Sequence, residues 1–144
     1  MSPKKKIELQ VGVKILLRNK EGKYLLLRRL LKKYPDIQGR WDILGGRISP
    51  GSTLLENLNR EIKEETGLKL VGEPRLIAAQ DILQIPGRHV VRLTYVGEAA
   101  GQVKLDTEEN DTYKWYTFEE IKNLDDLDIY FKKLLKNGRK PEIV

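Results

Sequence analysis

Three glutamates within one turn of an expected helix have the clearest potential for chemistry in this sequence. Glu61, Glu64 and Glu65 are spaced at i, i+3 and i+4, which places their carboxylates close together on an α-helix. Like charges at this spacing destabilise a helix. A bound cation would offset that repulsion, and carboxylate oxygens suit hard divalent ions, above all Mg²⁺. The three glutamates are therefore a candidate metal site.

The helix that must position these acids has clear start and stop signals. Thr53 and Glu56 have the spacing of an N-terminal capping box, and Gly67 is placed to end the helix in a left-handed conformation. A projection at about 100° per residue puts the acids at the edge of the apolar face, where burial makes an unpaired carboxylate costly. That apolar face consists of Leu54, Leu55, Leu58 and Ile62.

An ordinary charge-rich surface helix is the alternative interpretation. In that case Glu56 pairs with Arg60, and Lys63 pairs with nearby acids, as in many solvated helices. Composition alone does not separate the two interpretations. The glycine-rich segment ahead of the helix, with Gly45 and Gly46, favours a ligand site because glycine lets the backbone approach a ligand closely.

The segment Gly46–Leu68 resembles the Nudix box, whose pattern is G-x5-E-x7-R-E-U-x-E-E-x-G-U with U a bulky apolar residue. Every defining position matches except Ser52, which stands where the family has its first glutamate. The matching residues are Gly46, Arg60, Glu61, Ile62, Glu64, Glu65, Gly67 and Leu68.

The resemblance covers residues 9 to 135 and implies one Nudix domain of the α/β (α+β) class, with a mixed β-sheet sandwiched between helices. We expect this domain at 9–137, a basic N-terminal tail at 1–8 and a C-terminal tail at 138–144. Local patterns predict strands over 8–18, 23–30, 41–44, 70–83, 90–96 and 113–116, a loop over 31–39, and helices over 53–67, 117–124 and 127–138.

The resemblance further implies hydrolysis of a diphosphate linkage in a nucleoside diphosphate derivative, above all a nucleoside triphosphate. On that basis Glu61, Glu64 and Glu65 bind Mg²⁺ or Mn²⁺, and one acid takes a proton from the attacking water. We name Glu64 first as that base and Glu109 as the alternative. Glu109 also has a plain interpretation as a turn acid in the acidic run 106–111.

Ser52 is the point at which this chain departs from the family pattern. In the family, the arginine matched by Arg60 orients the acidic cluster, partly through the first glutamate. Ser52 cannot make that salt bridge, and Glu56 could replace it, although the capping box is the simpler role for Glu56. The departure affects catalytic efficiency more than metal binding. The alternative function is therefore a catalytically weakened Nudix domain that binds or senses nucleotides.

Several residues outside the acidic triad are candidates for contact with a substrate. Arg28 and Arg29 end the second expected strand, and Trp41 could stack on a base, while the backbone of Gly45 and Gly46 could approach a phosphate. A strand-end arginine is often an ordinary surface residue, and a tryptophan beside an apolar run is often core. Weaker candidates are Tyr34 for stacking and, by family analogy, Arg47 and Gln80, whereas the sole histidine, His89, is expected to fill space.

Composition limits the classes of partner and location. The chain has 144 residues and no cysteine, which suits one domain and fits a cytoplasmic location. Its net charge of +6 comes from its ends, because residues 7–131 carry −1, so nucleic acid is not the expected partner. RNA binding through those basic ends is a third, weaker hypothesis. No apolar run approaches the ~18 residues of a membrane span, so we expect no membrane association, and a homodimer is possible by family analogy.

Overall fold

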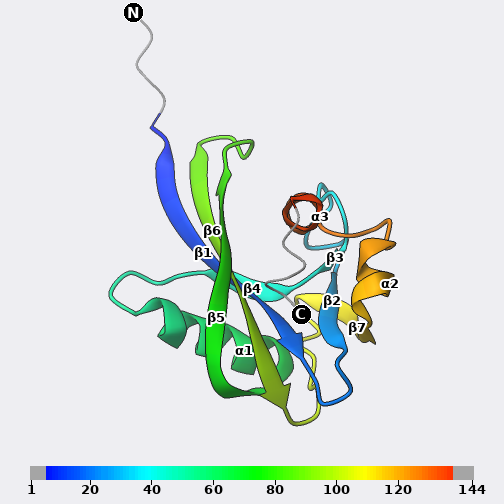
Figure 1. The fold of residues 1–144 in the computed structure, drawn as a ribbon. Coiled ribbons are helices and arrows are strands. Elements are labelled where there is room, and N and C mark those ends of the chain that lie inside the picture. The colour runs from blue at the N-terminus through cyan, green and yellow to red at the C-terminus, as the bar shows by residue number, and fades with distance from the viewer. Residues whose placement is uncertain (1–5, 138–144) are drawn as a thin grey trace, which may run out of the picture.

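A mixed β-sheet of seven strands lies at the centre of the computed structural model, which describes residues 6–137 (Figure 1). The strands are β1 (Glu8–Arg18), β2 (Tyr24–Arg29), β3 (Trp41–Asp42), β4 (Leu44–Arg47), β5 (Lys69–Ile82), β6 (Arg88–Ala100) and β7 (Asn110–Tyr116). The helices are α1 (Leu54–Thr66), α2 (Phe118–Lys122) and α3 (Ile129–Lys136).

The strand order places β1 at the centre of the sheet. The main path runs β3-β2-β1-β6-β5, with β4 also paired to β1 and β7 also paired to β2. β1 and β6 are parallel along their whole paired length, from Glu8 opposite Arg88 to Arg18 opposite Glu98. The other pairings are antiparallel, including the expected hairpin between β1 and β2. The mixed sheet confirms the predicted fold class.

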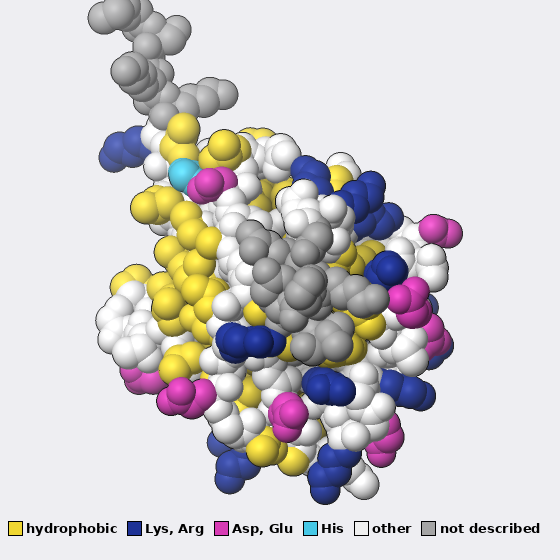
Figure 2. Space-filling view, in the orientation of Figure 1, with side chains coloured by type: hydrophobic (Ala, Val, Ile, Leu, Met, Phe, Trp, Pro, Cys, Tyr) yellow, Lys and Arg dark blue, Asp and Glu magenta, His cyan; other side chains and the backbone are white. Residues whose placement is uncertain are grey.

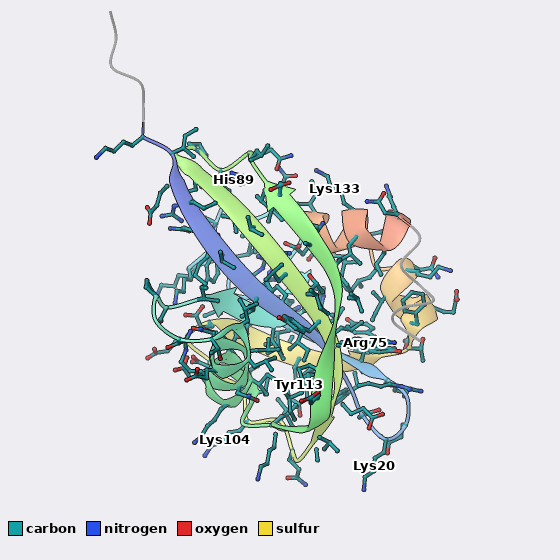
Figure 3. All side chains as sticks on the ribbon, turned by 60° about the vertical axis from the view of Figure 1, so that its left-hand side comes forward. Lys20, Arg75, His89, Lys104, Tyr113 and Lys133 are labelled. Atoms are coloured by element: carbon teal, nitrogen blue, oxygen red, sulfur yellow. The ribbon has the colours of Figure 1, made fainter. Side chains whose placement is uncertain are left out.

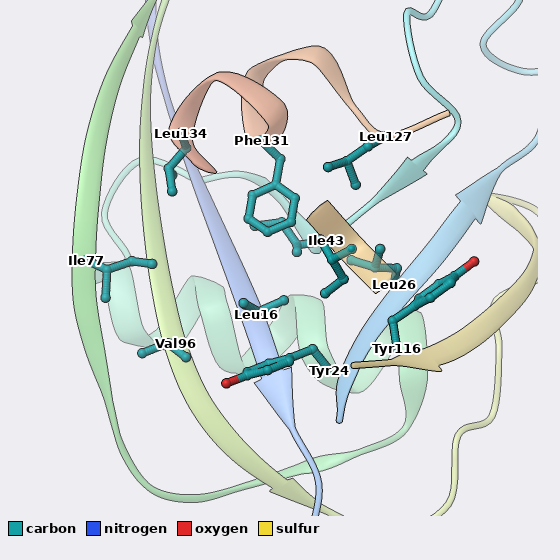
Figure 4. Close-up of a cluster of buried hydrophobic side chains, with 11 residues drawn as sticks. Leu16, Tyr24, Leu26, Ile43, Ile77, Val96, Tyr116, Leu127, Phe131 and Leu134 are labelled. Atoms are coloured by element: carbon teal, nitrogen blue, oxygen red, sulfur yellow. The ribbon is translucent and has the colours of Figure 1, made fainter. Parts of the chain in front are cut away.

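β1 is buried on both faces, which explains how helices pack on either side of the sheet. Because successive strand residues point to opposite faces, Val13, Ile15 and Leu17 join a core cluster with α1. Leu16 points the other way, into a second cluster with α2 and α3. Figure 4 shows Phe131 of α3 directed into this second cluster. Each leucine buried in this way contributes about 1.5–3 kcal/mol.

The predicted signals at the ends of α1 are confirmed. The Thr53 side chain accepts from the Glu56 amide, and the Glu56 side chain accepts from the Thr53 amide, each over 3.1 Å. Gly67 follows the last helical residue with φ of 68°, a left-handed conformation that favours glycine. A second capping box, formed by Thr117 and Glu120, starts α2.

The predicted single strand over 41–44 is wrong, because two short strands stand there. The Asp42 side chain accepts a hydrogen bond from the Ile43 amide over 2.8 Å, which interrupts the ladder. β3 before this point pairs with β2, and β4 after it pairs with β1. This change of partner strand, from β2 to β1, places β4 beside α1.

Other boundaries also differ from the expectations. Leu127 forms a bridge with Trp41 instead of starting the last helix, and α3 begins only after Asp128, whose side chain accepts from the Tyr130 and Phe131 amides. Glu8 belongs to β1, as predicted for the strand over 8–18, and not to the expected tail over 1–8. The expected helix end at Gly138 and the tail segments 1–5 and 138–144 lie outside the described residues. Within residues 6–137, no helix is long and apolar enough to cross a lipid bilayer.

Candidate active site

A cavity of about 830 Å³ opens between α1, β4 and the start of α3. Its volume is within the range of about 300–1,000 Å³ of small-molecule sites. It brings together carboxylates from α1 with the glycines of β4 and a glutamate that precedes β7. The residues singled out from the sequence that line it are Glu61, Glu64, Glu65, Gly45, Gly46, Glu109, Tyr34 and Arg47.

The Glu65 carboxyl group is largely removed from water. Burial raises its pKa, and although Lys14 and a hydrogen bond from the Gly45 amide act in the opposite direction, the pKa reaches about 8. Glu61 and Asp42 nearby add repulsion that raises it further. In the absence of a cation, Glu65 therefore keeps its proton at neutral pH.

Glu61 is held between an arginine and a glycine. Its Oε1 accepts a hydrogen bond from Arg60 Nη2 over 3.1 Å, and the Glu61 side chain is only 16% exposed. A Cβ atom added at Gly46 would lie 2.8 Å from the carboxylate carbon of Glu61, closer than real Cβ atoms approach. Position 46 therefore requires glycine for Glu61 to keep this orientation.

Glu64 differs from its two neighbours because it remains in water. Its side chain is 60% exposed, and Arg60 Nε lies 4.0 Å from its Oε1. Within residues 6–137 no three acidic, histidine or cysteine side chains form a ready-made metal cluster. The triad thus lines one wall without closing into an all-protein cage.

Glu109 reaches the cavity but is already paired. Its two carboxylate oxygens accept hydrogen bonds from Lys33 and Tyr34. Burial disfavours its charged form, but the hydrogen bonds from Lys33 and Tyr34 outweigh this effect, so the pKa of Glu109 lies below its usual value. Burial and the same hydrogen bond raise the pKa of Tyr34. These pairs hold the loop after β2 against the residues before β7.

The wall opposite α1 contains a network of charges, of which the sequence singled out only Arg29. Lys14 Nζ lies 2.9 Å from Asp42 Oδ2, and Arg29 and Arg92 contact Asp128 over 2.9 and 3.0 Å. Burial raises the pKa of Asp42, but Lys14, Arg92 and Arg29 outweigh it, so that pKa is lowered. Three cations face two anions here. A signal was present, because Lys14 and Arg92 each interrupt an apolar strand pattern at an inward position.

Arg28 and Trp41 do not line the cavity. Arg28 Nε donates to Asp111 over 2.7 Å, and its guanidinium carbon lies 5.8 Å from the ring centre of Trp41. Trp41 packs edge-on against Tyr116 with ring centres 5.4 Å apart. Because alternate residues of a strand point to opposite faces, it is Arg29 and not Arg28 that faces the site.

Gln80 and His89 lie away from the acidic triad. Gln80 Nε2 donates to the Tyr130 carbonyl over 2.9 Å, so it ties β5 to α3. His89 Nε2 lies 2.8 Å from Asp81 and its side chain is 36% exposed, so it does not fill the interior as expected. Figure 3 places His89 at the end of the sheet remote from α1, and Figure 2 shows it at the surface beside an acidic side chain.

Comparison with known proteins gives a consistent match. The model of the NUDIX domain matches residues 8–137. The nucleoside triphosphatase NudI of Klebsiella pneumoniae is 30% identical over 117 residues, covering 73% of this chain and 80% of the relative. The ADP-ribose pyrophosphatase of Methanocaldococcus jannaschii is 29% identical over 122 residues, covering 82% of this chain and 66% of the relative.

A solved structure agrees with the fold. The MutT protein from Methanosarcina mazei Go1 has a TM-score of 0.78 at 28% identity, covering 94% of this chain and 96% of that one. Other curated relatives are much longer, and this chain spans 21% of their length.

Proposed function

Since this chain belongs to the Nudix hydrolase family, we propose that it hydrolyses a diphosphate linkage in a nucleoside diphosphate derivative with Mg²⁺, or Mn²⁺, as cofactor. One observation carries the proposal: Glu61, Glu64 and Glu65 line a nucleotide-sized cavity together with the backbone of Gly45 and Gly46. The activity of the family is pyrophosphate hydrolysis.

The acids fit a magnesium site that is completed by substrate. Mg²⁺ commonly binds one or two protein carboxylates together with substrate phosphates and waters. Glu61 and Glu65 offer two such carboxylates, each already oriented by a hydrogen bond from Arg60 or Gly45. A metal held by these two carboxylates would neutralise phosphate charge and lower the pKa of a bound water. The open cluster of carboxylates therefore agrees with a cation that arrives with its substrate.

Glu64 is the residue best placed to take a proton from the attacking water. Its side chain is the most exposed of the three and its nearest cation, Arg60 Nε, is 4.0 Å away. Glu65 is hydrogen-bonded to backbone, and Glu61 is hydrogen-bonded to Arg60. Glu64 is thus the acid with the most freedom to accept a proton, as general base catalysis requires.

A nucleoside triphosphate is the substrate that we favour. The nucleoside triphosphatase among the relatives is matched over 80% of its own length, and an ADP-ribose pyrophosphatase, matched over 66%, marks the second candidate substrate. Opposite the acids, Arg29, Arg92 and Tyr130 line the same cavity. Arginine donors suit acceptor oxygens and nitrogens on a base or ribose. The phosphates would lie against α1 and the rest of the nucleotide against this wall.

The alternative function is a weakened Nudix domain that binds or senses nucleotides without turnover. The observation that favours it is Ser52 in place of the first glutamate of the box. Against it stands the contact between Arg60 and Glu61, which is present despite that replacement. Turnover therefore remains our first assignment.

A substrate panel with a matched pair of variants tests the proposal. Purified protein is incubated with nucleoside triphosphates, ADP-ribose and dinucleoside polyphosphates, with Mg²⁺ or with chelator, and product release is measured. We expect Mg²⁺-dependent release that Glu61→Gln reduces by about 100-fold. Glu119→Gln is the control, because this exposed glutamate lies on α2 outside the cavity. Saturable nucleotide binding without any product would favour the sensing domain.

We further propose a cytoplasmic location and a homodimer, neither of which is needed for the chemistry. The absence of cysteine from the sequence supports the location. Light scattering during gel filtration measures the oligomeric state, and a monomeric mass at micromolar concentration would remove the dimer.

A further inference from the structure

Asn57 is a buried polar residue of α1 to which neither the family pattern nor the proposed chemistry assigns a role. Its side chain is fully buried, at 0% exposure, one turn before Arg60. Buried amides are costly unless their hydrogen bonds are made. The contacts of Asn57 therefore explain why it is there.

All four hydrogen-bonding positions of the Asn57 amide are occupied. Oδ1 accepts from the Ser49 amide and from Arg60 Nη1, each over 2.8 Å. Nδ2 donates to the carbonyls of Ser52 and Thr53 over 3.2 and 2.6 Å. Two obligate donors face the oxygen and two obligate acceptors face the nitrogen, so the orientation of the amide is fixed.

Arg60 connects this amide to the candidate metal ligand. Its Nη1 is bound by Asn57 and also contacts Ser49 Oγ over 3.2 Å. Its Nη2 donates to Glu61 over 3.1 Å and lies 3.4 Å from the Arg47 carbonyl. A continuous path of hydrogen bonds thus runs from the loop before α1, through Asn57 and Arg60, to the Glu61 carboxylate.

We infer that Asn57 is the positioning residue that holds Arg60, and through it Glu61, in place of the acid that Ser52 lacks. Ser52 contributes only its backbone carbonyl to this arrangement. Glu56, the other candidate for the missing acid, is engaged in the capping box with Thr53. The inference rests on the proposed function only where it concerns turnover, because the orientation of Arg60 can be measured without substrate.

Removal of the amide and restoration of an acid at position 52 test the inference together. Asn57→Ala should weaken Mn²⁺ affinity and lower kcat, each by about 10-fold or more, as expected for a residue that orients a ligand. Adding Ser52→Glu to Asn57→Ala should restore most of both, because the new carboxylate can take over Arg60. The matched control is Asn59→Ala, an exposed asparagine on the same helix, which should change neither quantity.

Rescue separates positioning from a purely structural role. If Asn57 only anchors the loop, Ser52→Glu cannot restore Mn²⁺ affinity, and that result would overturn the inference. Unchanged Mn²⁺ affinity in a folded Asn57→Ala variant would overturn it as well. The NMR signal of the Arg60 guanidinium gives a direct readout: its hydrogen exchange should accelerate in Asn57→Ala and slow again in the double variant.

A single variant keeps the inference testable if Asn57→Ala does not fold. Ser52→Glu in the wild-type background should leave kcat and Mn²⁺ affinity within about twofold, because Arg60 already has its partner. A gain of about tenfold or more would overturn the inference, because it would mean that Arg60 is poorly held. If the wild-type protein binds Mn²⁺ but turns over no substrate, the proposed enzyme activity is contradicted. The Mn²⁺ affinities of wild type and Ser52→Glu can still be compared, so the inference on Asn57 is still tested.

Discussion

The backbone N–H of Gly45 donates a hydrogen bond to Oε2 of Glu65 over 2.9 Å. This contact joins β4 to α1 at the wall of the cavity and orients a carboxyl group that is largely buried. Because burial raises the pKa of Glu65 to about 8, the same side chain carries a proton in the metal-free protein at neutral pH. A cation bound by the Glu65 carboxylate would therefore displace this proton.

Metal binding should release a proton from Glu65 near neutral pH. A carboxylate must lose its proton to bind a cation, so the apparent Mg²⁺ affinity should rise with pH and level off above about 8. Calorimetric titration at pH 7 in two buffers of different ionisation enthalpy measures the protons released. Glu119→Gln should release as many as wild type. The same binding heat in both buffers would exclude this role for Glu65.

Glu65 should also make the metal-free protein less stable as the pH rises. Its folded pKa of about 8 lies above the ordinary value of 4.5. Between these values the unfolded chain loses the proton that the folded chain keeps, so each rise in pH favours unfolding. The loss should be on the order of 2–4 kcal/mol, after allowing for water that reaches the site.

Glu65→Gln isolates this contribution from other titrating groups. The amide oxygen can still accept from Gly45, but no proton is lost. The variant should gain stability over wild type at pH 9 and should match it near pH 4, in chemical denaturation with chelator present. An equal difference between the two proteins at both values of pH would contradict the assignment.

Gly46→Ala should disable the site while the fold persists. The new methyl group would lie 2.8 Å from the Glu61 carboxylate carbon and would displace it. The atoms that the methyl group would meet are the far end of the Glu61 side chain, so the fold can absorb the change. Misplacement of a catalytic group by about 1 Å can still lower turnover about 100-fold. Gly12→Ala is the control, since its added carbon would meet its nearest neighbour at an ordinary 3.5 Å. Equal activity in the two variants would contradict the role of Gly46.

Local patterns were sufficient to predict the helix that carries the acids and the central strand on which it packs. Alternation in β1 and the capping box at Thr53 depend on neighbouring residues only, and both are confirmed. The break at Ile43 was not predictable, because it depends on which strands lie beside the segment. An apolar run of four residues has the same pattern whether it pairs with one strand or with two.

The contacts between charged residues on the far wall of the site could not be predicted from the sequence, for a similar reason. Arg29, Asp42 and Asp128 lie far apart in the chain and meet only through the topology of the sheet. Arg28 and Arg29 could not be distinguished, since the choice depends on strand register. Asn57 carries no signal, because a polar residue on a charge-rich helix is ordinary until its burial is known.

Glu64, not Glu109, should be the general base of the reaction. Lys33 and Tyr34 hold the Glu109 carboxylate in hydrogen bonds that lower its pKa, so it is a weak proton acceptor. Glu64 has no such partners at hydrogen-bonding distance among the described residues, with Arg60 Nε 4.0 Å away. Glu64→Gln should therefore lower kcat by about 100- to 10,000-fold, and Glu109→Gln by less than about 10-fold.

The dependence of kcat on pH gives the second half of this test. If Glu64 is the base, the acidic limb of the kcat profile should remain in Glu109→Gln and should be lost in the residual activity of Glu64→Gln. Lys33→Met offers an independent check, because it frees Glu109 from its cation without touching α1. This variant should leave the acidic limb in place. If the midpoint of the acidic limb moves to higher pH in Lys33→Met, the general base is Glu109, whose pKa Lys33 helps to lower.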